Sequence, residues 1–324
     1  MAGQWRTRGV LSRIRTRIAF ARYGAGPYHP GMNRAVSLVL ALAALLSTPA
    51  AAGTVKGGVT VDGVAPIFPK WACALVVRES YDARNDEIVV VMTMKPFDAA
   101  KVASSLDPAS TLGVEPAVAK GDSVLVYLRR DGGISFNASH GYGDAAPQYA
   151  NSTAMGDIRA ELTAKTAARV AGRVFMPKPE KLLGGESMKL DVTFDAEIVR
   201  PPAGSPLPAG GGEPGKSLLG LLDAVAKRRW ADVQAGVTPA LRKDIVGSSS
   251  TTEKEFLDDA AKHFALTLPP KGLAITRGTL RADEAVLEIE GQQWGHGWVF
   301  FARMVKGGGG WLLDRSYPIG RIAE

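Results

Sequence analysis

The first part of the chain, residues 53–200, alternates short apolar runs with turn residues, a pattern typical of β-strands. The runs fall at 57–63, 72–80, 87–94, 122–130, 133–139, 168–176 and 188–199. In the last run, Leu190 and Val192 alternate with Lys189 and Asp191, which is typical of an antiparallel sheet with one buried face. The pattern predicts an antiparallel β-sandwich of immunoglobulin-like appearance, with one helical interruption at 98–106.

Helical spacing replaces this alternation after residue 216. Leu219, Leu222 and Trp230 recur as on one face of an amphipathic helix over 217–230. A second helix is predicted at 250–265, where Ser250 and Glu253 have the spacing of a capping box. Strand-like runs then follow at 273–280, 285–291, 297–305 and 311–317. Helices followed by antiparallel strands predict an α+β domain with its helices packed on one face of a curved sheet, and an α+β class for the whole chain.

A segment rich in proline and glycine, PPAGSPLPAGGGEPG, separates the two patterns at residues 201–215. Ten of its fifteen residues are proline or glycine, so it buries little apolar surface. We therefore expect a linker here, between one domain at 53–200 and a second at 216–324.

The same segment matches the phosphate-loop pattern G-x-x-x-x-G-K-S at Gly210, Gly215, Lys216 and Ser217. A phosphate loop follows directly on a buried strand. Here Pro206 and Pro208 precede the first glycine, and proline is unsuited to a central strand. We interpret the match as coincidental and expect no nucleotide or other cofactor.

The residues before the first domain have the features of a targeting segment. From Met32, a positive residue and an apolar run at 36–46 lead to small residues, and we predict signal-peptide cleavage between Ala52 and Gly53. The run is too short for the roughly 20 apolar residues that span a membrane. Cleavage would leave a periplasmic or extracellular protein with no membrane span. Residues 1–31 are interpreted as a mis-assigned start, the alternative being a disordered or membrane-surface leader.

The charge of the chain is concentrated in this leader. The formal net charge is +7, but residues 1–52 hold seven arginines and no acidic residue, which leaves 32 basic and 32 acidic residues in the remainder. A neutral body argues against nucleic-acid binding. No two histidines have metal-ligand spacing, and the single cysteine, Cys73, lies in an apolar run. We expect no metal site and a buried, unreactive thiol.

Three stretches of the second domain resemble a known superfamily. They are LLDAVAKRRWADVQAGVTP (221–239), DEAVLEIEG (283–291) and FFARMVKGGGGWLLD (300–314). Together they resemble the nuclear-transport-factor-two-like superfamily, the cone-shaped α+β fold also used by ketosteroid isomerases. The resemblance implies a pocket between the helices and the concave face of the sheet. Catalytic members place an aspartate base with a tyrosine or acid pair in that pocket, and no such set can be placed here by motif.

The most informative strand is WGHGWVFFARMV, residues 294–305, whose alternate positions form an aromatic and apolar face interrupted only by His296. An imidazole beside indoles could orient a ligand in a cavity, whereas the alternative is that these side chains fill the core. With two aromatic residues of the helices, the candidates for a ligand pocket are Trp230, Phe264, Trp294, His296, Trp298 and Phe300.

Three functions stay open. We favour an exported, non-catalytic protein that binds a small apolar ligand or a protein partner through its second domain. The second is an isomerase, dehydratase or hydrolase that uses the same pocket, and the third is a structural protein that forms a homodimer or larger homo-oligomer. A pocket where His296 meets a carboxylate favours the enzyme, a pocket without that pair favours the binding protein, and a filled interior favours the structural protein.

Overall fold

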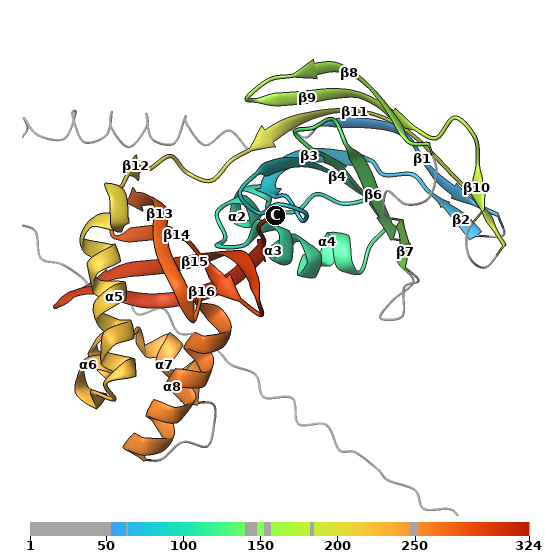
Figure 1. Ribbon diagram of the computed structural model, residues 1–324. Helices are drawn as coiled ribbons and strands as arrows, with labels where there is room; N and C mark the ends of the chain where they lie inside the picture. Colours follow the sequence, from blue (N-terminus) through green and yellow to red (C-terminus); the bar gives the residue numbers. More distant parts are fainter. Residues whose placement is uncertain are drawn as a thin grey trace, which may run out of the picture. The chain divides into compact units, whose positions relative to one another are not determined.

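The computed structural model describes residues 53–62, 64–139, 148–151, 157–181, 185–246 and 252–323 (Figure 1). The predicted leader and signal peptide, including Ala52, lie outside these residues. The described chain is a mixed α+β structure with two sheets that are almost entirely antiparallel, in agreement with the α+β class expected from the periodicities.

The first sheet contains eleven strands in the described part of the chain. They are β1 (Thr54–Val61), β2 (Val64–Ile67), β3 (Trp71–Arg78), β4 (Asp86–Thr93), β5 (Ser123–Leu128), β6 (Ile134–Ser139), β7 (Gln148–Asn151), β8 (Arg159–Lys165), β9 (Arg169–Phe175), β10 (Glu180–Lys181) and β11 (Ser187–Val199). The hydrogen-bonded order is β2-β1-β11-β3-β4-β5-β6-β7, and β9 links β8 to β11.

Strand β11 joins the two halves of this sheet. It pairs with β1 as far as Asp195, which lies opposite Thr54 at the start of β1, and its last residues then pair with β3. The β11–β3 pairing is parallel, with Ile198 opposite Ala74, so the sheet departs at this point from the antiparallel pattern that the sequence predicts. Alternation within one strand identifies its buried face but not the direction of its neighbour.

Each face of the sheet has its own core. One core combines side chains of β1, β9 and β11 with those of β3–β6, and it includes the alternating residues Leu190, Val192 and Phe194. The opposite face of β3–β5 is covered by α2 (Ala99–Ala103), α3 (Pro108–Val114) and α4 (Pro116–Ala119) (Figure 1). The helical interruption expected at 98–106 is thus confirmed in α2, and two further helices follow it.

Cys73 lies in the core beneath these helices. It is 4% exposed, and burial raises the pKa of its thiol to about 12. Desolvation disfavours the thiolate, so the residue is the buried, unreactive cysteine that its apolar run predicts.

The second sheet has five antiparallel strands in sequence order, with helices on one face (Figure 1). Its strands are β12 (Ser205–Pro206), β13 (Lys271–Arg281), β14 (Glu284–Gln293), β15 (His296–Gly307) and β16 (Gly310–Arg321). The helices are α5 (Gly212–Ala226), α6 (Trp230–Ala235), α7 (Pro239–Val246) and α8 (Glu253–Thr267).

Two helix boundaries differ from the sequence prediction. The helix expected over 217–230 ends at Ala226, and Trp230 begins the separate helix α6 after Arg228 adopts a positive φ of 55°. Helix α8 is capped by Thr252, whose side chain accepts from the Glu255 N–H in a complete capping box. The expected pair began two residues earlier, because the segment STTEKE offers the same three-residue spacing at both places.

The predicted linker 201–215 is largely part of the second fold. Ser205–Pro206 forms the edge strand β12, and α5 already begins at Gly212, so that Gly215 is buried within the helix. Gly210, Gly211 and Gly212 all have positive φ and turn the chain sharply into this helix. A Cβ at Gly211 would lie 2.9 Å from the Leu287 side chain. The glycines therefore allow the helix and the sheet to approach closely. The same glycine content would also fit a flexible linker, so composition alone does not separate the two structures.

Candidate functional site

Three of the six predicted pocket residues belong to the hydrophobic core or its margin. Phe300 is fully buried and Phe264 is 4% exposed. Trp230 packs edge-on against Phe256, with the ring centroids 4.8 Å apart. Phe264 and Phe300 thus have little surface for a ligand, and Trp230 is half-buried.

The helices and the sheet of the second domain share one hydrophobic core. One cluster joins α5–α8 to the sheet and includes fully buried residues of three strands, Ala285, Leu287, Ile289, Phe300, Ala302, Met304 and Leu313. These apolar groups are withdrawn from water and pack against one another as the core of the second domain. These positions belong to the core, and the pocket that the resemblance implies stays a prediction.

The other three predicted residues lie together at one end of the sheet. Trp294 and Gly295 form the tight turn between β14 and β15, with φ of 51° and 81°. The Trp294 side chain is 65% exposed and meets Trp298 edge-on, with centroids 5.2 Å apart. His296 is half-buried beside them. A bulky residue with positive φ is strained, since asparagine or glycine normally occupies such a turn.

Two buried polar atoms near this turn have no hydrogen-bond partner among the described residues, Trp298 Nε1 and Gln293 Oε1. The Gln293 Nε2 group donates to the last turn of α8, to Ala265 O at 3.1 Å and Leu266 O at 3.3 Å. Gln293 and Trp298 lie on the same face of neighbouring strands, because Gln293 of β14 pairs with His296 and Gly291 pairs with Trp298. Gln293 is absent from the predicted set, and its place as an inward-facing residue at a strand end is the only signal the sequence offers.

Carboxylates of the second domain lie mainly in surface ion pairs. Asp223 lies 2.9 Å from the Lys227 ammonium group, and Asp258 accepts from Arg228 at 2.9 Å. His263 is partly buried, and burial lowers its pKa although the charge of Asp244 opposes the shift. These pairs do not form the acid–base arrangement expected of an isomerase site.

The phosphate-loop match lies in a context unlike that of a phosphate loop. The strand before it, β12, has two residues, both exposed. Lys216 is exposed and pairs with Glu213 at 2.8 Å. A Cβ at Gly215 would come 1.9 Å from the Gly210 carbonyl oxygen. The glycine spacing thus reflects the contact between the first turn of α5 and the loop before it.

A second group of buried titratable residues, missed by the sequence reasoning, lies on the helix-covered face of the first sheet. Glu79 and Glu87 are 8% and 5% exposed. Burial, and then the negative charge of Glu79, raises the pKa of Glu87 to about 7, while Arg129 opposes the shift. Tyr127 lies close to Glu87, whose charge adds to the effect of burial in raising the tyrosine pKa, and its hydroxyl bonds Asn137. The only sequence signal is the presence of two acidic residues within apolar strands.

Comparison with known proteins identifies no relative: no family model matches the sequence, and no curated protein or solved structure is significantly similar to it. Within the described residues, no helix is both long and apolar enough to span a bilayer. The same residues contain no group of three or more histidine, cysteine, aspartate or glutamate side chains arranged to hold a metal ion.

Proposed function

We propose that this chain is an exported, non-catalytic binding protein built from an immunoglobulin-like sandwich and a nuclear-transport-factor-two-like cone. The basis for export is the sequence of residues 32–52, which has the order of charged, apolar and small residues found in signal peptides. The basis for the cone is the order of helices and antiparallel strands after residue 212, together with the resemblance of its sequence. The mature protein would begin at Gly53.

The observation that carries the proposed binding function is the strained, exposed Trp294 beside two unsatisfied polar atoms. Backbone strain of this kind costs of order 1–3 kcal/mol and persists where it serves a function. An exposed indole that packs edge-on against a second indole is a common anchor for a ligand or partner. We therefore place the binding site at the Trp294 end of the sheet, with Trp298, His296 and Gln293.

The two unsatisfied atoms indicate the chemistry of the ligand. Trp298 Nε1–H needs an acceptor, and Gln293 Oε1 needs a donor. A hydroxyl group can both accept and donate a hydrogen bond, which favours a small, mainly apolar ligand that carries a hydroxyl. Trp294 covers Trp298 and would move aside to admit it. The enzyme alternative would require an acid–base pair within hydrogen-bond reach in an enclosed cavity.

Native mass spectrometry of the protein recovered from its own compartment tests this proposal. We expect a chain that begins at Gly53 and retains a small molecule, which is released when Trp298 is replaced by phenylalanine. A protein recovered as a ligand-free homodimer would support the structural alternative and contradict the binding function.

A second experiment separates binding from stability at Trp294. Asparagine tolerates positive φ, so Trp294→Asn should raise the free energy of unfolding by up to about 1 kcal/mol while it abolishes ligand retention. Trp311→Phe is the matched control, because Trp311 packs against the same core from β16 and lies away from the turn. Ligand retention that survives Trp294→Asn, or that is lost equally in Trp311→Phe, would refute the assignment.

A further inference from the structure

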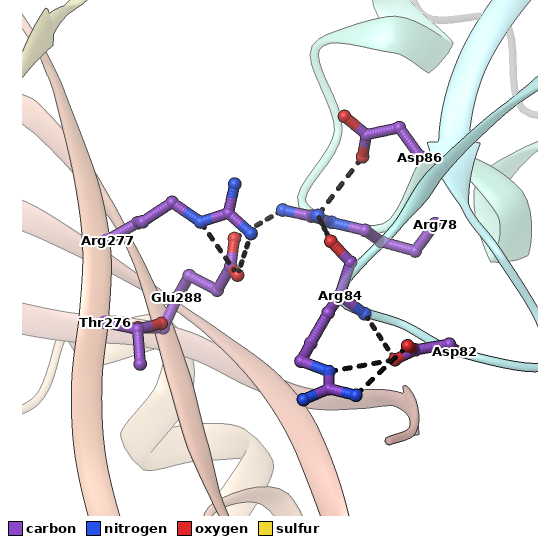
Figure 2. A network of polar contacts seen from close by, with 7 residues as sticks. All are labelled: Arg78, Asp82, Arg84, Asp86, Thr276, Arg277 and Glu288. Atoms are coloured by element: carbon purple, nitrogen blue, oxygen red, sulfur yellow. Dashed lines mark hydrogen bonds and ion pairs between the residues drawn. The ribbon is translucent and has the colours of Figure 1, made fainter. Parts of the chain in front are cut away.

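An ion network joins the first sheet to the second (Figure 2). Glu288 of β14 accepts from Arg78 of β3 through one carboxylate oxygen and from Arg277 of β13 through the other, at 2.9 Å from Arg277 Nη2. Arg78 also contacts Asp86 at 3.1 Å and lies over the Phe301 ring at 5.2 Å. Residues from both folds therefore meet in one cluster.

The members of this network satisfy one another. Side-chain exposure is 6% for Glu288 and 17% for Arg78, so both charges are largely withdrawn from water. Each buried charge has an opposite charge in contact, which is the condition under which burial is tolerated. Arg78, Arg277, Asp86 and Glu288 are thus held in place, and their charges are largely neutralised.

A cavity of about 340 Å³ lies against this network. Its charged lining consists of four arginines, Arg78, Arg200, Arg277 and Arg281, and two acids, Asp86 and Glu288. Four guanidinium groups against two carboxylates leave a formal charge of +2 around a small, partly enclosed space. A cavity of this size is at the lower end of the range seen for small-molecule sites.

The excess positive charge belongs to Arg200 and Arg281. Neither has a carboxylate partner among the described residues. The Arg200 Nε donates to the Ala167 carbonyl at 3.2 Å, which leaves its terminal nitrogens for other acceptors. The Arg281 Nε is buried and has no hydrogen-bond partner in the described chain. Gly204 lies close by, such that a Cβ there would come within 2.8 Å of Arg281 Cγ.

The same cavity has an apolar wall. Val76, Leu106, Val286 and Phe301 line it beside the charged groups. A ligand that fits both surfaces carries an anionic group at one end and an uncharged, apolar body at the other. Guanidinium groups suit this task because their planar forks match carboxylate and phosphate oxygens.

We propose that this cavity binds a small organic anion, whose carboxylate or phosphate group is held by Arg281 and Arg200 and whose apolar part lies on Phe301 and Val286. This site is separate from the Trp294 end of the second sheet and goes beyond the function proposed there. The Glu288 network positions the cavity walls, and the two unpaired arginines recognise the anion.

Isothermal titration of the mature protein with inorganic phosphate, butyrate and hexanoate, with hexanamide as the neutral comparison, tests the site. We expect at least one anion to bind with a Kd below roughly 10 mM, and hexanamide to bind at least about tenfold more weakly than hexanoate. Tighter binding of phosphate identifies a phosphate group and tighter binding of hexanoate a carboxylate, and either result supports the proposal. Absence of binding by all three anions, or equal binding of hexanoate and hexanamide, would overturn it.

Variants localise the binding. Arg281→Gln and Arg200→Gln should each weaken anion binding by roughly tenfold or more, because each removes a charge-assisted hydrogen bond. Arg281→Lys keeps the positive charge but loses the planar guanidinium fork. Its affinity for the anion should therefore lie between those of Arg281→Gln and the parent. The matched control is Arg159→Gln on β8, an exposed arginine paired with Asp157. Thermal unfolding of each variant confirms that it is folded. Unchanged affinity in both folded glutamine variants, or an equal loss in Arg159→Gln, would show that the cavity is not the site.

Discussion

Replacing Glu87 with glutamine tests the reasoning about buried charge in the first sheet. Glutamine has the shape of a protonated glutamate and cannot ionise, so it removes the charge and little else. In the native protein the pKa of Glu87 is raised from its ordinary value of 4.5 to about 7, mainly by burial and then by the charge of Glu79. The folded state therefore holds a proton that the unfolded chain loses at lower pH.

The sign and size of the effect follow from this difference. Between pH 4.5 and about 7 the folded state binds more protons than the unfolded state, so stability falls as pH rises through this window. Each pKa unit corresponds to about 1.4 kcal/mol, which makes the full loss about 3 kcal/mol above pH 7. Below pH 4.5 both states are protonated and the contribution of Glu87 to pH dependence vanishes.

Urea unfolding, monitored by circular dichroism at about pH 4 and about pH 8, measures the difference in the free energy of unfolding between the parent and Glu87→Gln. The two proteins should be similarly stable at the lower pH, and the variant should be more stable by about 3 kcal/mol at the higher one. Protection of β3–β5 amides from hydrogen exchange assigns the change to this sheet. The exposed Glu161→Gln on β8 serves as control. A stability difference between the parent and Glu87→Gln that is the same at both pH values would refute the linkage.

Three further predictions concern single positions. In urea unfolding, Gly215→Ala should destabilise the second fold by roughly 1–3 kcal/mol, because the new Cβ meets the Gly210 carbonyl. Gly220→Ala is the control in the same helix. Its Cβ meets no atom within 4 Å, so it should stabilise the helix by roughly 0.5–1 kcal/mol. Thr252→Ala removes the cap of α8 and should cost about 1 kcal/mol in the same assay; no loss would mean that the capping box contributes nothing to stability. Cys73 should resist a thiol reagent at neutral pH until the protein unfolds, and rapid labelling of the native state would contradict its burial.

Much of the secondary structure could be predicted from the sequence. The alternation over 188–199 identified the buried face of β11, and the runs at 273–317 correspond to β13–β16. Such signals are local, because the hydrophobic periodicity of a strand or helix can be recognised within a short stretch of sequence. The boundaries were less accurate, as at the start of α5, where three positive-φ glycines form a turn that looks like a flexible linker in composition.

The candidate sites were predictable only in part. Trp294, His296 and Trp298 do lie together, because alternate residues of one strand share a face. Phe300 shares that face and is nevertheless core, since burial depends on the helices packed above it. Gln293 and Glu87 were missed because a polar residue in an apolar run carries no sign of whether it is paired, exposed or unsatisfied.

The sequence by itself determined the α+β class, the order of its elements and the faces of its longer strands, because these depend on neighbours within a few residues. Tertiary structure alone decided the parallel pairing of β11 with β3, the burial of Phe300 in the core of the second domain, and the contact between Arg78 and Glu288, which are 210 positions apart. These features arise from the relative placement of distant elements. The burial of a charge and the lining of a cavity are properties of that placement, and no local pattern of residues encodes them.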